Sequence, residues 1–94
     1  MNEQINRTMI ARGVDARGRD YELYDYGADG LAPKTINGLP NSNTYRYWCY
    51  YCGGRVFACG NSRDELIRQM RYSTEESRYY GLHGRFELLD GKAA

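Results

Sequence analysis

The alternation of polar and apolar residues predicts two β-hairpins in the first two thirds of the chain. The first, over residues 7–26, turns around 16–19, and its second half is rich in residues that favour strands. The second, over residues 44–60, turns at Gly53 and Gly54, because a tight two-residue turn needs the positive φ that glycine adopts readily. The two hairpins supply four strands.

The turn of the second hairpin predicts its register. The register gives three pairs, which are Cys52 with Arg55, Tyr50 with Phe57, and Trp48 with Cys59. The large apolar rings of Trp48 and Phe57 favour burying their face of the hairpin beneath a helix. Because side chains alternate between the two faces of a strand, the other face then turns Tyr45, Tyr47 and Tyr51 outward.

A capping box and an apolar stripe predict a helix after the second hairpin. Ser62 precedes Glu65 by three positions, the spacing at which the two side chains cap a helix start. Leu66, Ile67 and Met70 then follow on one helical face. This face should pack on the sheet.

The pattern beyond this helix predicts a change of direction. A second capping pair, Ser73 with Glu76, indicates a break near residues 72–74, after which a second helical piece runs to Tyr80 and closes at Gly81.

The last predicted strand covers residues 85–89, with Phe86 and Leu88 on one face. The order of elements is therefore β-β-β-β-α-β. Such an order is typical of an α+β fold in which a helix packs on one face of an antiparallel sheet.

The length of 94 residues is that of a single small domain, residues 1–94. Residues 1–6 and 91–94 are expected to be flexible tails. Residues 27–43 are punctuated by Gly, Asn and Pro without a regular period, so they are expected to form a long loop.

The charges are nearly balanced and interleaved along the chain. The formal net charge is +1, from 13 basic and 12 acidic residues, which argues against a polyanion binder that works through its overall field. The chain also carries ten tyrosines, one tryptophan and eleven arginines. These residue types are enriched at binding hot spots, so the composition favours a binding surface.

Three cysteines and one histidine are the candidates for chemistry. Cys49 and Cys52 have the C-x-x-C-G shape of half a zinc knuckle, and Cys59 and His83 could complete a set of four ligands. The predicted register points Cys49 and Cys52 to opposite faces, so we expect small buried thiols and no cofactor or metal. A small zinc-binding or catalytic protein that uses these four residues stays as an alternative.

The cellular location predicted from the sequence is the cytoplasm. An odd number of cysteines without an export signal is typical of free thiols in a reducing compartment. The chain has no apolar run near the length of a membrane span, and its first residues lack the apolar stretch of a signal peptide.

Residues 45–70 resemble in layout the two strands and helix of the arm-type DNA-binding domains of phage integrases and of their plant relatives, the AP2-like domains. The segment reads YRYWCYYCGGRVFACGNSRDELIRQM. In this resemblance Arg46 and Arg55 are the sheet arginines that would contact DNA. In size and character the whole chain resembles small phage-encoded inhibitors of host defence, such as anti-CRISPR proteins. That resemblance implies a compact protein without catalytic motifs, which blocks a nucleic-acid-handling complex by occupying its surface.

The sequence as a whole favours a non-enzymatic protein-binding module, an inhibitor whose partner is a nucleic-acid-binding complex and not a membrane. The alternative is a domain that binds DNA or RNA directly through its sheet. The residues expected to contact the partner are Tyr45, Tyr47, Tyr51, Arg46, Arg71 and Arg78.

Overall fold

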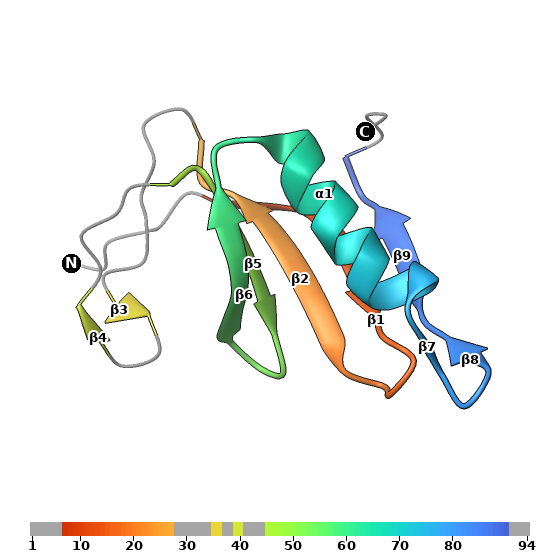
Figure 1. Ribbon diagram of the computed structural model, residues 1–94. Coiled ribbons are helices and arrows are strands. Elements are labelled where there is room, and N and C mark those ends of the chain that lie inside the picture. Colours follow the sequence, from red (N-terminus) through yellow and green to blue (C-terminus); the bar gives the residue numbers. More distant parts are fainter. Residues whose placement is uncertain (1–6, 28–34, 37–38, 41–44, 91–94) are drawn as a thin grey trace.

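The fold is a five-stranded antiparallel sheet with one helix lying across one face (Figure 1). This computed structural model describes residues 7–27, 35–36, 39–40 and 45–90. The strands of the sheet, in spatial order, are β6 (Arg55–Gly60), β5 (Tyr47–Tyr51), β2 (Asp20–Asp25), β1 (Thr8–Val14) and β9 (Arg85–Leu88). The predicted α+β fold and its β-β-β-β-α-β order are confirmed for these elements.

The loop of the second hairpin begins one residue earlier than the sequence predicts. Tyr51 pairs with Arg55, so the loop holds three residues, and the first of them, Cys52, has a positive φ of 51°. Trp48 pairs with Cys59 as predicted, but Tyr50 faces Val56. β6 contains a bulge between these two pairs, and the bulge shifts the pairing register by one residue.

The predicted faces of this hairpin are wrong, because the helix covers the tyrosine face. Tyr47 and Cys49 lie in the core with Leu66 from the helix, and Tyr47 is only 7% exposed. Cys49 pairs with Leu23 of β2, and the Leu23 side chain lies in the same core beneath the helix. Trp48 lies on the opposite face and is also fully buried, so neither face of β5 is a free surface.

The helix α1 (Arg63–Arg71) begins as predicted. The Ser62 side chain accepts a hydrogen bond from the Glu65 amide at 3.3 Å. The predicted apolar stripe is buried over the sheet; its residues are Leu66, Ile67 and Met70. Phe86 and Leu88 of β9 pack against the same core, which confirms the face predicted for the last strand.

The segment after α1 differs from the prediction. The helix does change character at Tyr72, but it continues as a single π-helical turn, η1 (Tyr72–Glu76). The predicted second helical piece to Tyr80 is wrong, because Ser77 is extended and a small hairpin follows. Its strands are β7 (Arg78–Tyr79) and β8 (Leu82–His83), and Gly81 turns this hairpin with a φ of 80° instead of closing a helix.

Within the predicted loop 27–43, two short strands pair with each other, β3 (Thr35–Ile36) and β4 (Leu39–Pro40). Most of the rest of that loop and both predicted tails lie outside the described residues. Among the helices that the structure describes, none is both long and apolar enough to cross a membrane.

Candidate protein-binding surface

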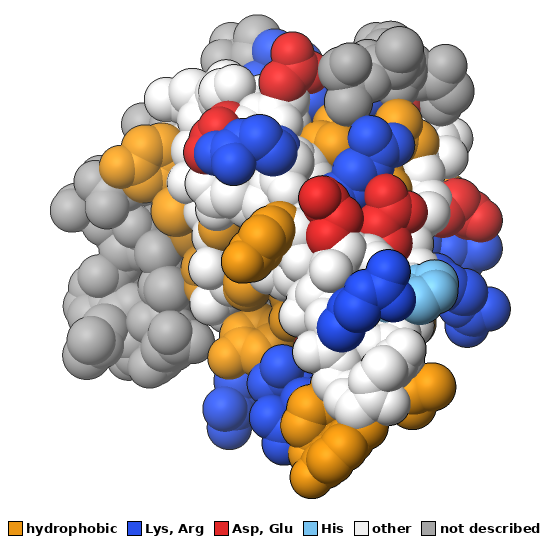
Figure 2. All heavy atoms as spheres, turned by 45° about the vertical axis from the view of Figure 1, so that its right-hand side comes forward, with side chains coloured by type: hydrophobic (Ala, Val, Ile, Leu, Met, Phe, Trp, Pro, Cys, Tyr) orange, Lys and Arg blue, Asp and Glu red, His pale blue; other side chains and the backbone are white. Residues whose placement is uncertain are grey.

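Exposed apolar side chains gather on the β7–β8 hairpin. Tyr79, Tyr80 and Leu82 are 43%, 87% and 63% exposed, although they lie within four consecutive residues. Figure 2 shows hydrophobic and basic side chains together at the lower end of the molecule, the end at which Figure 1 places this hairpin. Exposed apolar residues that cluster, unlike single scattered ones, mark surfaces that contact another molecule.

The turn of this hairpin has an unfavourable residue at its first central position. Tyr80 has a φ of 53° and Gly81 a φ of 80°, the positive values that a two-residue type I′ turn requires. Asparagine, aspartate and glycine adopt positive φ readily, whereas a bulky residue does so rarely and at a cost in free energy. Tyr80 gains little from the fold in return, since its side chain is 87% exposed and its ring meets that of Tyr79 edge-on, at 4.5 Å between centroids.

Two arginines flank these apolar side chains. The Arg17 guanidinium, from the β1–β2 turn, lies 5.0 Å from the centroid of the Tyr79 ring. Arg78 is exposed on β7, opposite His83 of β8. We refer to the following five residues as the hairpin surface: Arg17, Arg78, Tyr79, Tyr80 and Leu82.

The base of the hairpin is tightly packed, in contrast to its tip. Gly84 is buried, and a Cβ added there would overlap the Val14 carbonyl oxygen. The Gly84 amide donates to the Thr74 carbonyl at 3.0 Å. Thr74 is itself fully buried, and its hydroxyl donates to the Met70 carbonyl at 2.7 Å. The hairpin is therefore fastened to η1 and β1 through the backbone.

The turn that carries Arg17 is fixed by a buried carboxylate. Asp15 accepts hydrogen bonds from the backbone amides of Arg17 and Arg19, both at 2.9 Å, and from the Arg19 Nε at 2.6 Å. Burial would raise the pKa of Asp15, but these bonds and one from Tyr21 outweigh it and lower the pKa. Burial, and then the Asp15 charge, raise the pKa of Tyr21 to about 12.

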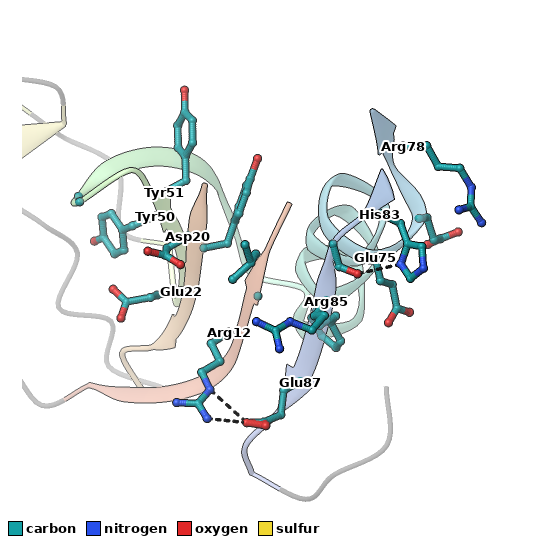
Figure 3. A pocket seen from close by; sticks show the side chains of 18 residues that line it. Arg12, Asp20, Glu22, Tyr50, Tyr51, Glu75, Arg78, His83, Arg85 and Glu87 are labelled. Carbon is teal, nitrogen blue, oxygen red and sulfur yellow. Dashed lines mark hydrogen bonds and ion pairs between the residues drawn. The ribbon is translucent and has the colours of Figure 1, made fainter. Parts of the chain in front are cut away.

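A depression of about 1220 Å³ lies at the same end of the sheet (Figure 3). On the sheet face away from α1 it carries a lateral row of Tyr50, Glu22, Arg12 and Glu87. Figure 3 shows Arg12 pointing to Glu87, and their ion pair measures 3.0 Å. Charges of both signs alternate along this row, so the depression favours no ligand charge.

Further along that face, an aromatic cluster is held by contacts within the protein. Tyr50 stacks on Trp48, and its hydroxyl lies 2.8 Å from that of Tyr26. Arg7 donates to the Tyr26 hydroxyl at 3.1 Å and lies 3.9 Å from the centroid of the Tyr24 ring. Burial, followed by the hydrogen bond with Tyr26, raises the pKa of Tyr50 above its ordinary value. These rings stabilise the sheet rather than offer free faces for stacking.

The residues predicted to contact a partner do not form one patch. Tyr47 is in the core, Tyr45 packs against Trp48, and Tyr51 stacks on Tyr21. The three arginines are also placed apart. Arg46 is ion-paired with Asp25 at 2.8 Å on β2, Arg71 lies 4.7 Å from the centroid of the Phe86 ring, and Arg78 is on the hairpin surface.

Of the other residues of the hairpin surface, Tyr79 and Tyr80 escaped the sequence prediction because it extended a helix through them. The signal that the sequence holds for this turn is weak. Gly81 adopts positive φ readily, but a glycine fits the end of a helix as well as a hairpin turn.

The cysteines and the histidine lie in different environments. Cys49 is buried, which raises the pKa of its thiol to about 12, whereas Cys52 is exposed in the β5–β6 turn. Burial also raises the pKa of the half-buried Cys59. The His83 Nδ1 lies 3.1 Å from the Gly84 carbonyl oxygen. Within the described ranges, no group of three or more His, Cys, Asp or Glu side chains is arranged to hold a metal ion.

No family model matches the chain, and no curated protein and no solved structure is significantly similar to it.

Proposed function

We propose that this chain is a non-enzymatic protein-binding module that docks through the hairpin surface. The observation that supports the proposal best is Tyr80. Its side chain is 87% exposed, and it occupies a turn position at which asparagine or glycine would cost less. A residue that adds strain and little packing is better explained by a contact outside the chain than by the fold.

The other residues of the surface fit the same role. Tyrosine and arginine are the side chains that dominate the energy of protein interfaces, and Leu82 adds an exposed aliphatic group beside them. The packed base at Gly84 and Thr74 limits the motion of the hairpin, so less conformational entropy is lost on binding. A rigid protrusion with apolar residues at its tip suits a recess on a partner protein.

Affinity capture with matched variants tests the proposal. The wild-type chain and the variants Tyr80→Asn and Leu82→Ser are immobilised and exposed to nuclease-treated lysate of the cells in which the chain occurs. Leu89→Ser is the control, because Leu89 is a 40% exposed leucine at the far end of β9 from the hairpin. We expect wild type and control to retain the same proteins, and both hairpin variants to lose them. Equal capture by all four chains, or capture that disappears with nuclease, would contradict the proposal.

Direct binding of DNA or RNA through the sheet is the weaker proposal. One of its two sheet arginines, Arg46, is ion-paired with Asp25, and the aromatic rings beside it are packed against each other. Inhibition of a nucleic-acid-handling complex, by a protein of the anti-CRISPR type, stays a prediction from the sequence. The capture experiment tests this inhibition only indirectly, by showing which protein the chain binds.

A further inference from the structure

We infer that the hairpin surface recognises an acidic protein segment, in which Asp or Glu side chains flank an apolar residue. The inference rests on the proposed function and specifies the chemistry of the partner. It follows from the charges around the exposed rings of Tyr79 and Tyr80.

The two arginines of the hairpin surface are free to bind a partner carboxylate. Neither Arg17 nor Arg78 forms an ion pair with a residue that the structure describes. Of the nearby acids of the fold, Asp15 binds Arg19 and Glu75 lies 3.7 Å from Arg71.

The acidic side chains of this region lie towards the base of the hairpin, not at its tip. Glu75 and Glu76 belong to η1, which precedes β7. Figure 2 shows acidic side chains beside the histidine and above the hairpin, with basic and hydrophobic groups below them. A partner that meets the tip contacts Tyr80 and Leu82 first and then Arg17 beside the Tyr79 ring, whose charge carboxylates complement.

Arg17 is held in place for this contact before the partner arrives. The Asp15 carboxylate fixes the backbone of its turn, and its guanidinium lies over the Tyr79 ring. An ordered arginine loses less side-chain entropy when it binds a carboxylate, and its planar group can bind the two oxygens at once.

The same surface suits a nucleic acid less well. Leu82 is 63% exposed and can neither stack on a base as a ring does nor bind a phosphate. An acidic peptide with one apolar side chain satisfies both the arginines and the leucine.

Selection from a displayed library of random 12-residue peptides tests the inference. The full-length chain is the target, and peptides that also bind the double variant Tyr80→Asn/Leu82→Ser are discarded. We expect the retained peptides to be rich in Asp and Glu next to an apolar residue. Arg17→Gln/Arg78→Gln should weaken their binding roughly tenfold at low salt, and by less at high salt.

Arg55→Gln is the matched control, because Arg55 is an exposed arginine on β6, at the opposite edge of the sheet from β9. It should leave peptide affinity unchanged, and thermal melts should show that every variant is folded. Retained peptides without an acidic bias, or equal losses from the control and the double arginine variant, would refute the inference and leave the proposed function standing. If no peptide depended on Tyr80 and Leu82, the inference would fail, and the capture experiment would decide the proposed function separately.

Discussion

The β5–β6 and β7–β8 hairpins are alike in composition but opposite in the burial of their side chains. Both contain neighbouring tyrosines, and both place a non-glycine residue at positive φ in the turn, Cys52 in one and Tyr80 in the other. In β5–β6 the strand residues Tyr47, Trp48 and Cys49 are all buried. In β7–β8 every strand residue is exposed, including Tyr79.

The difference arises from what lies beside each hairpin. β5 has β2 and β6 as neighbours and α1 over one face, and Trp48 on its other face is also buried. The β7–β8 hairpin forms a separate two-stranded sheet, and it is joined to the domain mainly at its base. Tyrosine content therefore says nothing about the role of a hairpin until its neighbours are known.

Removal of a ring from each hairpin should separate the two roles most clearly. Tyr47→Ala empties a core site and should lower the free energy of unfolding by about 3–5 kcal/mol. Tyr80→Ala removes an exposed ring and should change it by less than about 0.5 kcal/mol. Urea titrations followed by circular dichroism measure both values. Similar losses in the two variants would mean that the hairpins are not used differently.

A methyl group at the base of the β7–β8 hairpin should act like a core mutation even though the tip is exposed. In Gly84→Ala the new Cβ meets the Val14 carbonyl and the Asp15 backbone, which cannot move as a flexible side chain can. We expect a loss of roughly 3 kcal/mol, at the upper end for overpacked sites. Gly54→Ala at the β5–β6 turn is a useful contrast, because its Cβ would meet open space and only the positive φ opposes it.

The β1–β2 turn, which presents Arg17 beside the hairpin, should depend on pH through Asp15. The folded pKa of Asp15 is lowered, so its stabilising contribution is present above the unfolded value near 4 and is lost as the pH falls through the folded pKa. Asp15→Asn should cost about 2 kcal/mol at neutral pH, because several donors lose a charged acceptor. Unfolding curves between pH 7 and 2 should show a smaller loss of stability for the variant than for wild type.

The smallest expected effect is a gain in folding stability from the substitution Tyr80→Asn. Tyr80→Asn puts the preferred residue at the first central position of a type I′ turn, so it should raise the free energy of unfolding by about 0.5–1 kcal/mol. The same variant should lose partner binding. A lower melting temperature for Tyr80→Asn would show that the ring supports the fold, which would remove the main argument for a binding role.

The sequence predicted the parts of the fold that local patterns control. Ser62 begins the helix and Leu66, Ile67 and Met70 bury its stripe, because capping and periodicity act within a few residues. The pairing of β1 with β2 and of β5 with β6 is local in the same sense, because each pair is joined by a short turn.

The hairpin surface could not be predicted in this way, for two physical reasons. First, a one-residue bulge in β6 shifted the register of Tyr50, and both faces of β5 are apolar enough to be buried. Second, Ser73 and Glu76 resemble a helix start, but tertiary contacts of Thr74 with Gly13 and Gly84 favour a π-turn followed by a hairpin instead. Contacts distant in sequence decided the second outcome.

The π-helical turn η1 also limits how the chain can change in length. A π-turn holds about one residue more than an α-helical turn, and each residue of an α-helix rotates the chain by about 100°. Deletion of one residue from η1 would let α1 continue regularly, yet it would rotate everything after it and separate Gly84 from its place beside Val14. Insertions and deletions should therefore be tolerated at the Tyr80–Gly81 tip but not in η1, where chain length sets the direction of the hairpin.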